Sequence, residues 1–138
     1  MMTRPATGSL TWGLGFLGFI PIPFFSLLIV AIVAIVASAV YPSQRRHGPI
    51  AEGNARNAAN WAWTAFLVLV LSVVLTTLLV ALQNFYTPGP FPGRLPFLVL
   101  LGVGITHPVL CIMGLVAASK GQGLRVPYAI PFIRAAWG

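Results

Sequence analysis

The stretch THPVLC, residues 106–111, contains the side chains of this sequence that are best suited to form a reactive site. His107 and Cys111 are four residues apart, so a helix would place them on one face, where they could relay a proton or ligate a metal. Metal sites commonly take three or four protein ligands, and the chain offers only one acid, Glu52, and one other histidine, His47. The sequence therefore does not favour a metal centre.

The neighbouring Pro108 suggests a structural reason for His107. Inside a helix, Pro108 would remove the hydrogen bond that the carbonyl of Gly104 normally accepts. Thr106 or a neutral His107 could help to satisfy the exposed backbone, and His107 could also meet a polar residue on another helix. We expect His107 and Pro108 to serve structure and not chemistry.

A second polar group lies upstream, in AEGNARNAANW, residues 51–61. Asn54, Asn57, Asn60 and Thr64 would lie on overlapping faces of one helix. Buried amides need partners, and bonds between membrane helices supply them at about 0.6–2 kcal/mol each. These side chains either join helices or line a polar entry to a cavity, and both interpretations remain open.

Catalytic patterns are missing from the sequence. One acid excludes paired carboxylates, and there is neither a Ser-His-acid set nor a phosphate loop. GLGFLG, residues 13–18, matches a dinucleotide fingerprint only in its letters, because no acid follows about 20 residues later. We expect no enzyme activity, no catalytic residue, no metal and no cofactor.

The elements that must position these residues are membrane helices. Apolar residues make up 58% of the 138 residues and charged ones 7%, too few to cover a water-soluble surface. We predict an all-α integral membrane protein: a small bundle of three full transmembrane helices and a short N-terminal segment broken by proline. The expected segments of this single domain, 1–138, are 10–20, 24–41, 61–82 and 97–118, with the break at Pro21–Pro23.

The cations mark the connections between these segments. The basic connector 42–60 and the tail 119–138 carry three each, Arg125 among them, and the loop 83–96 carries one. By the positive-inside rule we expect both termini in the cytoplasm and residues 83–96 outside, in a bacterial inner membrane. Val126, Tyr128, Ile130 and Phe132 alternate, so we expect an extended tail lying on the membrane surface. The basic residues are dispersed and not gathered on one face, which argues against nucleic acid.

The order of these features resembles a bacterial membrane family, the domain of unknown function 4870, which is grouped with the small inner-envelope translocon subunit of chloroplasts. The resemblance rests on Ala58-Ala59-Asn60-Trp61 and on GLRVPYAIPFI, residues 123–133, and covers about Gly13 to Ile133. It implies a small helical membrane domain and no established activity.

These observations favour a small non-catalytic membrane protein that is an accessory or stabilising subunit of a larger bacterial complex, such as a respiratory or envelope assembly. Expected partners are membrane lipids and other integral membrane subunits, because small residues on the spans allow close helix packing and the basic tail suits anionic lipid. The alternative is a transporter or translocation-channel component. Its path would be lined by Asn57, Asn60, Thr64 and His107. For either role, the structural and interaction candidates of the chain are Asn57, Asn60, Thr64, His107, Pro108 and Arg125.

Overall fold

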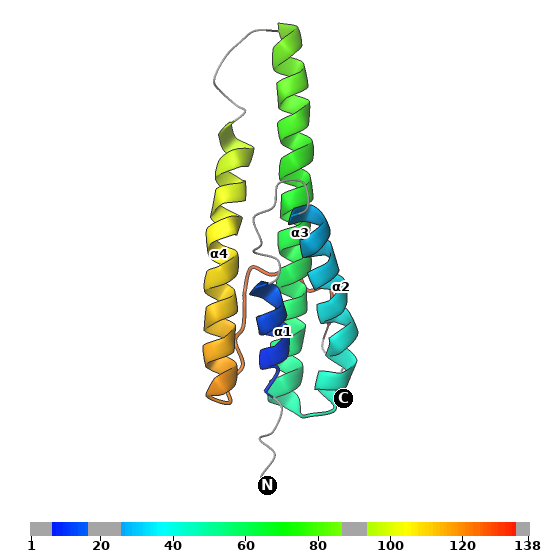
Figure 1. Cartoon of the computed structure of the whole chain (residues 1–138), viewed down its shortest axis with the longest axis vertical. Helices are drawn as coiled ribbons and strands as arrows, with labels where there is room; N and C mark the ends of the chain where they lie inside the picture. The colour runs from blue at the N-terminus through cyan, green and yellow to red at the C-terminus, as the bar shows by residue number, and fades with distance from the viewer. Residues whose placement is uncertain (1–6, 17–25, 87–93, 135–138) are drawn as a thin grey trace.

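The computed structural model describes residues 7–16, 26–86 and 94–134. They form four helices: α1 (Ser9–Gly15), α2 (Ser26–Arg45), α3 (Pro49–Tyr86) and α4 (Arg94–Ser119). α2 and α4 pack on α3, and the short α1 packs against α3 and α4 (Figure 1). The expected all-helical fold is confirmed for these residues.

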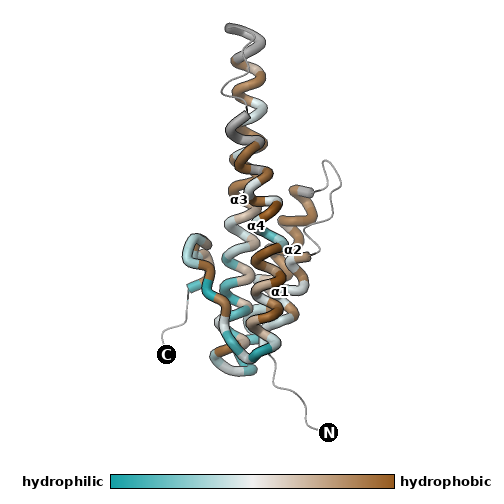
Figure 2. The backbone as a smooth tube through the Cα atoms, turned by 90° about the vertical axis from the view of Figure 1, so that its left-hand side faces the viewer, coloured by the Kyte–Doolittle hydropathy of each residue, from teal (hydrophilic) through white to brown (hydrophobic). Residues whose placement is uncertain are grey.

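Three of the helices are long and apolar enough to cross a membrane, over Leu27–Arg45, Pro49–Leu82 and Leu101–Ser119. Large aliphatic side chains point outward from all three, as expected where lipid is the solvent. In Figure 2 hydrophobic colours cover most of the helices, and hydrophilic ones gather at one end and along the C-terminal segment. The chain is a membrane protein.

The helices are packed through small side chains. On α3 the buried alanines are spaced by three and four residues, so they form one continuous face, made of Ala51, Ala55, Ala58, Ala59, Ala62 and Ala65. Ala34 of α2 lies against Ala62 together with Val33. Without large side chains between them the backbones can approach closely, which maximises dispersion contacts where lipid provides no hydrophobic drive.

The connection between α2 and α3 is shorter than the expected connector 42–60, whose second half the sequence already allowed to start a helix. α2 continues through Pro42 to Arg45, and α3 already begins at Pro49, so only residues 46–48 join the two helices. Gly48 in this link has φ +110°, a conformation that favours glycine. The polar run is helical because Ala51, Ala55 and Ala58 bury its inner face, and tertiary packing therefore outweighs its polar composition.

Other segment limits also differ from expectation. Residues 83–86 belong to α3 and 94–96 to α4, so the loop is shorter than 83–96, and residues 87–93 lie outside the described part. α1 ends at Gly15, and the predicted break at Pro21–Pro23 lies outside the described residues as well. α4 runs from Arg94 through Pro108 to Ser119 as one helix.

α4 ends in a glycine turn that sends the chain back along α3. Gly121 has φ +68°, and the Gln122 N–H bonds the Ala117 carbonyl at 2.9 Å while the Gly121 N–H bonds Ala118. This pairing is the Schellman motif, which satisfies the last carbonyls of a helix and reverses the chain. The turn lies at the same end of the bundle as residues 46–48, opposite the ends of α3 and α4 at Tyr86 and Arg94 (Figure 1).

Candidate functional site

The polar face of α3 holds the C-terminal segment, residues 120–134, which we call the tail. The tail contains no regular helix or strand, and it rises beside α4 and then crosses behind α3 (Figure 1). Two backbone hydrogen bonds lie within it, from Ala129 to Val126 and from Phe132 to Ile130, and the other buried backbone groups need partners outside the tail. Side chains of α3 provide these partners.

Asn54 is fully buried and makes three hydrogen bonds, two of them with the tail. Its Nδ2 donates to the Gln122 carbonyl at 2.9 Å and to the Thr7 carbonyl at 2.8 Å, and its Oδ1 accepts from the Leu124 N–H at 2.9 Å. One side chain thus joins α3, the segment that leads into α1 and the start of the tail. Gly8 makes room for this, because a Cβ there would lie 2.7 Å from the Asn54 Cβ.

Asn57, Asn60 and Thr64 continue the contact up the helix. Asn57 Nδ2 donates to the Leu124 carbonyl at 2.6 Å. Asn60 makes a two-way pair with Ile133, donating to its carbonyl at 3.1 Å and accepting from its N–H at 2.7 Å. The Thr64 hydroxyl accepts from the Ile130 N–H at 2.8 Å and donates to the Asn60 carbonyl.

The order of these bonds gives the path of the tail. It rises along α3 from Asn54 to Thr64 and then turns back to Asn60. We call the four side chains Asn54, Asn57, Asn60 and Thr64 the tail clasp. Their hydrogen bonds to the tail are with its backbone groups and not with its side chains.

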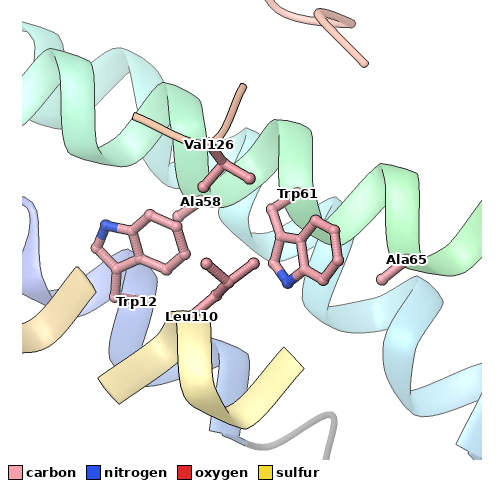
Figure 3. Close-up of a cluster of buried hydrophobic side chains, with 6 residues drawn as sticks. All are labelled: Trp12, Ala58, Trp61, Ala65, Leu110 and Val126. Carbon is pink, nitrogen blue, oxygen red and sulfur yellow. The ribbon is translucent and has the colours of Figure 1, made fainter. Parts of the chain in front are cut away.

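The tail does not present one apolar edge as expected. Val126 is 6% exposed and enters the bundle core, whereas Tyr128, Ile130 and Phe132 are about half exposed. Figure 3 shows Val126 and Leu110 between the rings of Trp12 and Trp61, with Ala58 close to Val126 and Ala65 on the far side of Trp61. The tail is therefore packed into the fold and is not a free extended segment on the membrane surface.

His107 is buried at the junction of α1, α3 and α4. The Trp61 Nε1–H donates to its Nδ1 at 3.0 Å, and its Nε2 lies 2.8 Å from the Gly15 carbonyl oxygen. Indole can only donate and a carbonyl can only accept, so these partners assign the neutral ring with its proton on Nε2. His107 thus bonds other helices, and its two nitrogens are both occupied.

Two glycines allow α1 to lie close to α4. A Cβ on Gly15 would come within 2.5 Å of the Cys111 Sγ, and one on Gly114 would overlap the ring of Trp12. Trp12 is 1% exposed, and its Nε1–H finds no acceptor among the described residues. Cys111 is buried, 3.8 Å from the His107 Nε2.

Among the residues that the structure describes, no three His, Cys, Asp or Glu side chains gather to hold a metal ion. The only acid, Glu52, accepts a hydrogen bond from the Tyr41 hydroxyl at 2.9 Å. The predicted candidates thus fall into separate places: Asn57, Asn60 and Thr64 in the tail clasp, His107 and Pro108 in α4, and exposed Arg125 in the tail. Sequence reasoning missed Trp12 and the bond from Trp61.

A family model described as the magnetosome magnetite crystal formation protein family matches residues 6–133. This finding overturns the resemblance to the domain of unknown function 4870 and to translocon-like proteins. Neither the curated proteins nor the solved structures contain a match to the chain.

Proposed function

We propose a role in magnetite crystal formation for this chain, because it belongs to the magnetosome magnetite crystal formation protein family. The magnetosome membrane is an invagination of the bacterial inner membrane, and we place the chain there. Within it the chain acts as a small non-catalytic subunit that stabilises a larger membrane protein assembly. Both termini then face the cytoplasm, as the distribution of cations suggests.

This proposal rests on the contacts that the buried polar side chains make. Asn54, Asn60, Thr64 and His107 are buried, and each bonds another part of the same chain. Their contacts stabilise one compact arrangement and present few polar groups to a substrate. Such a protein contributes to an assembly through its shape and its outer surface.

The shortage of metal ligands supports an indirect action on the mineral. Iron is held in proteins by carboxylates, imidazoles and thiolates. Glu52 is bonded to Tyr41, His107 has both nitrogens occupied, and Cys111 is buried. We infer that the chain affects crystals through proteins that it holds, and that it does not template the mineral with its own acids.

A translocation path lined by Asn57, Asn60, Thr64 and His107 receives no support from these contacts, because the side chains bond the tail, Trp61 and Gly15. Purified chain in vesicles should therefore pass ferrous or other cations no faster than empty vesicles. Flux that requires the chain would favour the path instead.

The accessory role is tested in a magnetosome-forming bacterium. Deletion of the gene should change the size or number of crystals seen by electron microscopy, while the membrane vesicles still form. Tagged chain extracted in mild detergent should carry other membrane proteins in fixed stoichiometry. A stable lone monomer, or unchanged crystals after deletion, would contradict the proposal.

The outer surface offers a matched pair of variants. Leu71, Val74 and Leu78 lie on one exposed face of α3, and Leu28, Ile32 and Ile35 are similarly exposed on α2. Triple alanine substitution on each face keeps the surface apolar but changes its shape. If one face packs against the partner, only that variant should lose the co-purifying proteins. Equal retention by both variants would show that lipid alone covers the two faces.

A further inference from the structure

The tail and α3 form an open pocket whose lining is strongly basic. Its volume is about 580 Å³, and three arginines line it: Arg56 of α3, Arg125 of the rising tail and Arg134 near the end of the tail. Arg56 is distant in sequence from the other two, and all three line one pocket because the tail packs along α3 and turns back on itself. Asn57 and Asn60 also line the pocket.

The tail clasp fixes the positions of the two tail arginines. Asn57 bonds the carbonyl of Leu124, the residue before Arg125. Asn60 bonds both backbone groups of Ile133, the residue before Arg134. Because each arginine directly follows a clamped peptide unit, its backbone is held beside the pocket while its exposed side chain stays free to turn toward a ligand.

The positive charge of the pocket favours the binding of an anion. The whole sequence has eight Lys and Arg residues against one acid, and that acid, Glu52, accepts the Tyr41 hydroxyl. Three guanidinium groups around one cavity repel one another unless an anion lies between them. Guanidinium forks match phosphate oxygens in paired hydrogen bonds, and they are more weakly hydrated than an ammonium group.

The surroundings of the pocket favour a phosphate that carries acyl chains. Tyr128, Ile130 and Phe132 lie in the tail between Arg125 and Arg134, and they are 57%, 42% and 50% exposed. On α3 the uncharged run begins at Trp61, directly after the pocket residue Asn60. The pocket therefore lies where the uncharged run of α3 begins, which is the level expected for lipid headgroups.

We propose that the pocket lined by Arg56, Arg125 and Arg134 binds the phosphate group of an anionic phospholipid headgroup. The lipid would lie with its phosphate among the arginines and its chains over the exposed apolar residues of the tail. The proposal concerns the chain as a membrane protein and does not depend on its action in crystal formation.

The test uses the purified full-length chain in mixed micelles of a mild detergent with phosphatidylglycerol, and native mass spectrometry to count bound lipid. The double variant Arg125→Gln/Arg134→Gln removes two pocket charges. Arg45→Gln/Lys120→Gln removes two charges outside the pocket and is the matched control. We expect the affinity for phosphatidylglycerol to fall about tenfold or more in the pocket variant, and to change less than about twofold in the control.

Further arms identify the source of the phosphate and guard against misfolding. Phosphatidylcholine in place of phosphatidylglycerol should bind weakly, and inorganic phosphate should displace the lipid only at far higher concentration. Displacement by inorganic phosphate at matched concentration would show that the pocket binds the free phosphate ion and would overturn the proposal of a lipid headgroup. Equal losses in both variants, or no loss in the pocket variant, would refute the site. Tryptophan fluorescence should show the same thermal unfolding for both variants.

Discussion

Replacing Asn54 with alanine should release the tail from α3. Asn54 is the one side chain of the tail clasp that bonds both the tail and Thr7, the residue next to Gly8. The variant leaves the alanine face of α3 unchanged, since alanine already occupies positions 51, 55 and 58. Its effect should therefore be local, and should appear as opening of the tail before the bundle unfolds.

The size of the effect follows from the bonds lost. Two of the three hydrogen bonds of Asn54 join the tail, and the bond to Thr7 is kept when the tail opens. Each contributes about 0.5–1.5 kcal/mol net, which gives about 1–3 kcal/mol for the two. Gln122 is exposed, so water can partly replace its lost donor, and we take a value near the middle, about 2 kcal/mol. The tail should then open about thirtyfold more often, since 1.4 kcal/mol corresponds to a factor of ten.

Limited proteolysis measures this opening directly. In the purified chain, trypsin cleaves after Arg125 only when the tail leaves α3, so the initial rate reports the open fraction when reclosing is faster than cleavage. Cleavage after Lys120, in the exposed turn at the end of α4, provides an internal reference. Mass spectrometry of the early peptides distinguishes the two sites.

Asn57→Ala is the matched control for the Asn54 variant. Its bond to the Leu124 carbonyl is a single one, so the loss of about 1 kcal/mol should accelerate cleavage after Arg125 by about fivefold. If Asn54→Ala is cleaved no faster than the wild type, or no faster than Asn57→Ala, the hydrogen bonds do not hold the tail and the reasoning is refuted.

The other predictions concern the buried junction of the helices. Gly114→Ala should destabilise the bundle by about 1–3 kcal/mol, because its methyl group would overlap the buried ring of Trp12, and denaturant unfolding should show it. Gly102→Ala is the control on the same helix and meets nothing within 4 Å, so its stability should be unchanged or slightly higher. His107→Leu leaves the buried indole of Trp61 without its acceptor and should cost about 1–3 kcal/mol; an unfolding midpoint equal to that of the wild type would contradict this.

The resemblance to the wrong family has an instructive cause. A proline-interrupted first segment, a polar run before a long span and a basic aromatic-proline tail are features that many small multi-span chains share. They follow from the need to begin, connect and end helices in lipid. Their order therefore predicts the architecture of the chain and does not distinguish one family from another.

The sequence by itself determined the membrane character and the helical fold, because both follow from local properties. Uncharged stretches such as Trp61–Leu82 are long enough to cross a bilayer, and a backbone in lipid must bond itself. The spacing of Asn54, Asn57, Asn60 and Thr64 likewise placed them on neighbouring faces of one helix. These inferences needed no knowledge of distant parts of the chain.

Only the tertiary structure decided what those side chains contact. An asparagine amide bonds any peptide group of suitable position, so the sequence could not select the tail, whose residues lie 66 to 73 positions away from their partners in the tail clasp. The same holds for His107, whose partner Gly15 is 92 residues distant. Helix periodicity is set by neighbours in the chain, whereas these bonds depend on how whole elements pack, and one Cβ at Gly114 would prevent that packing.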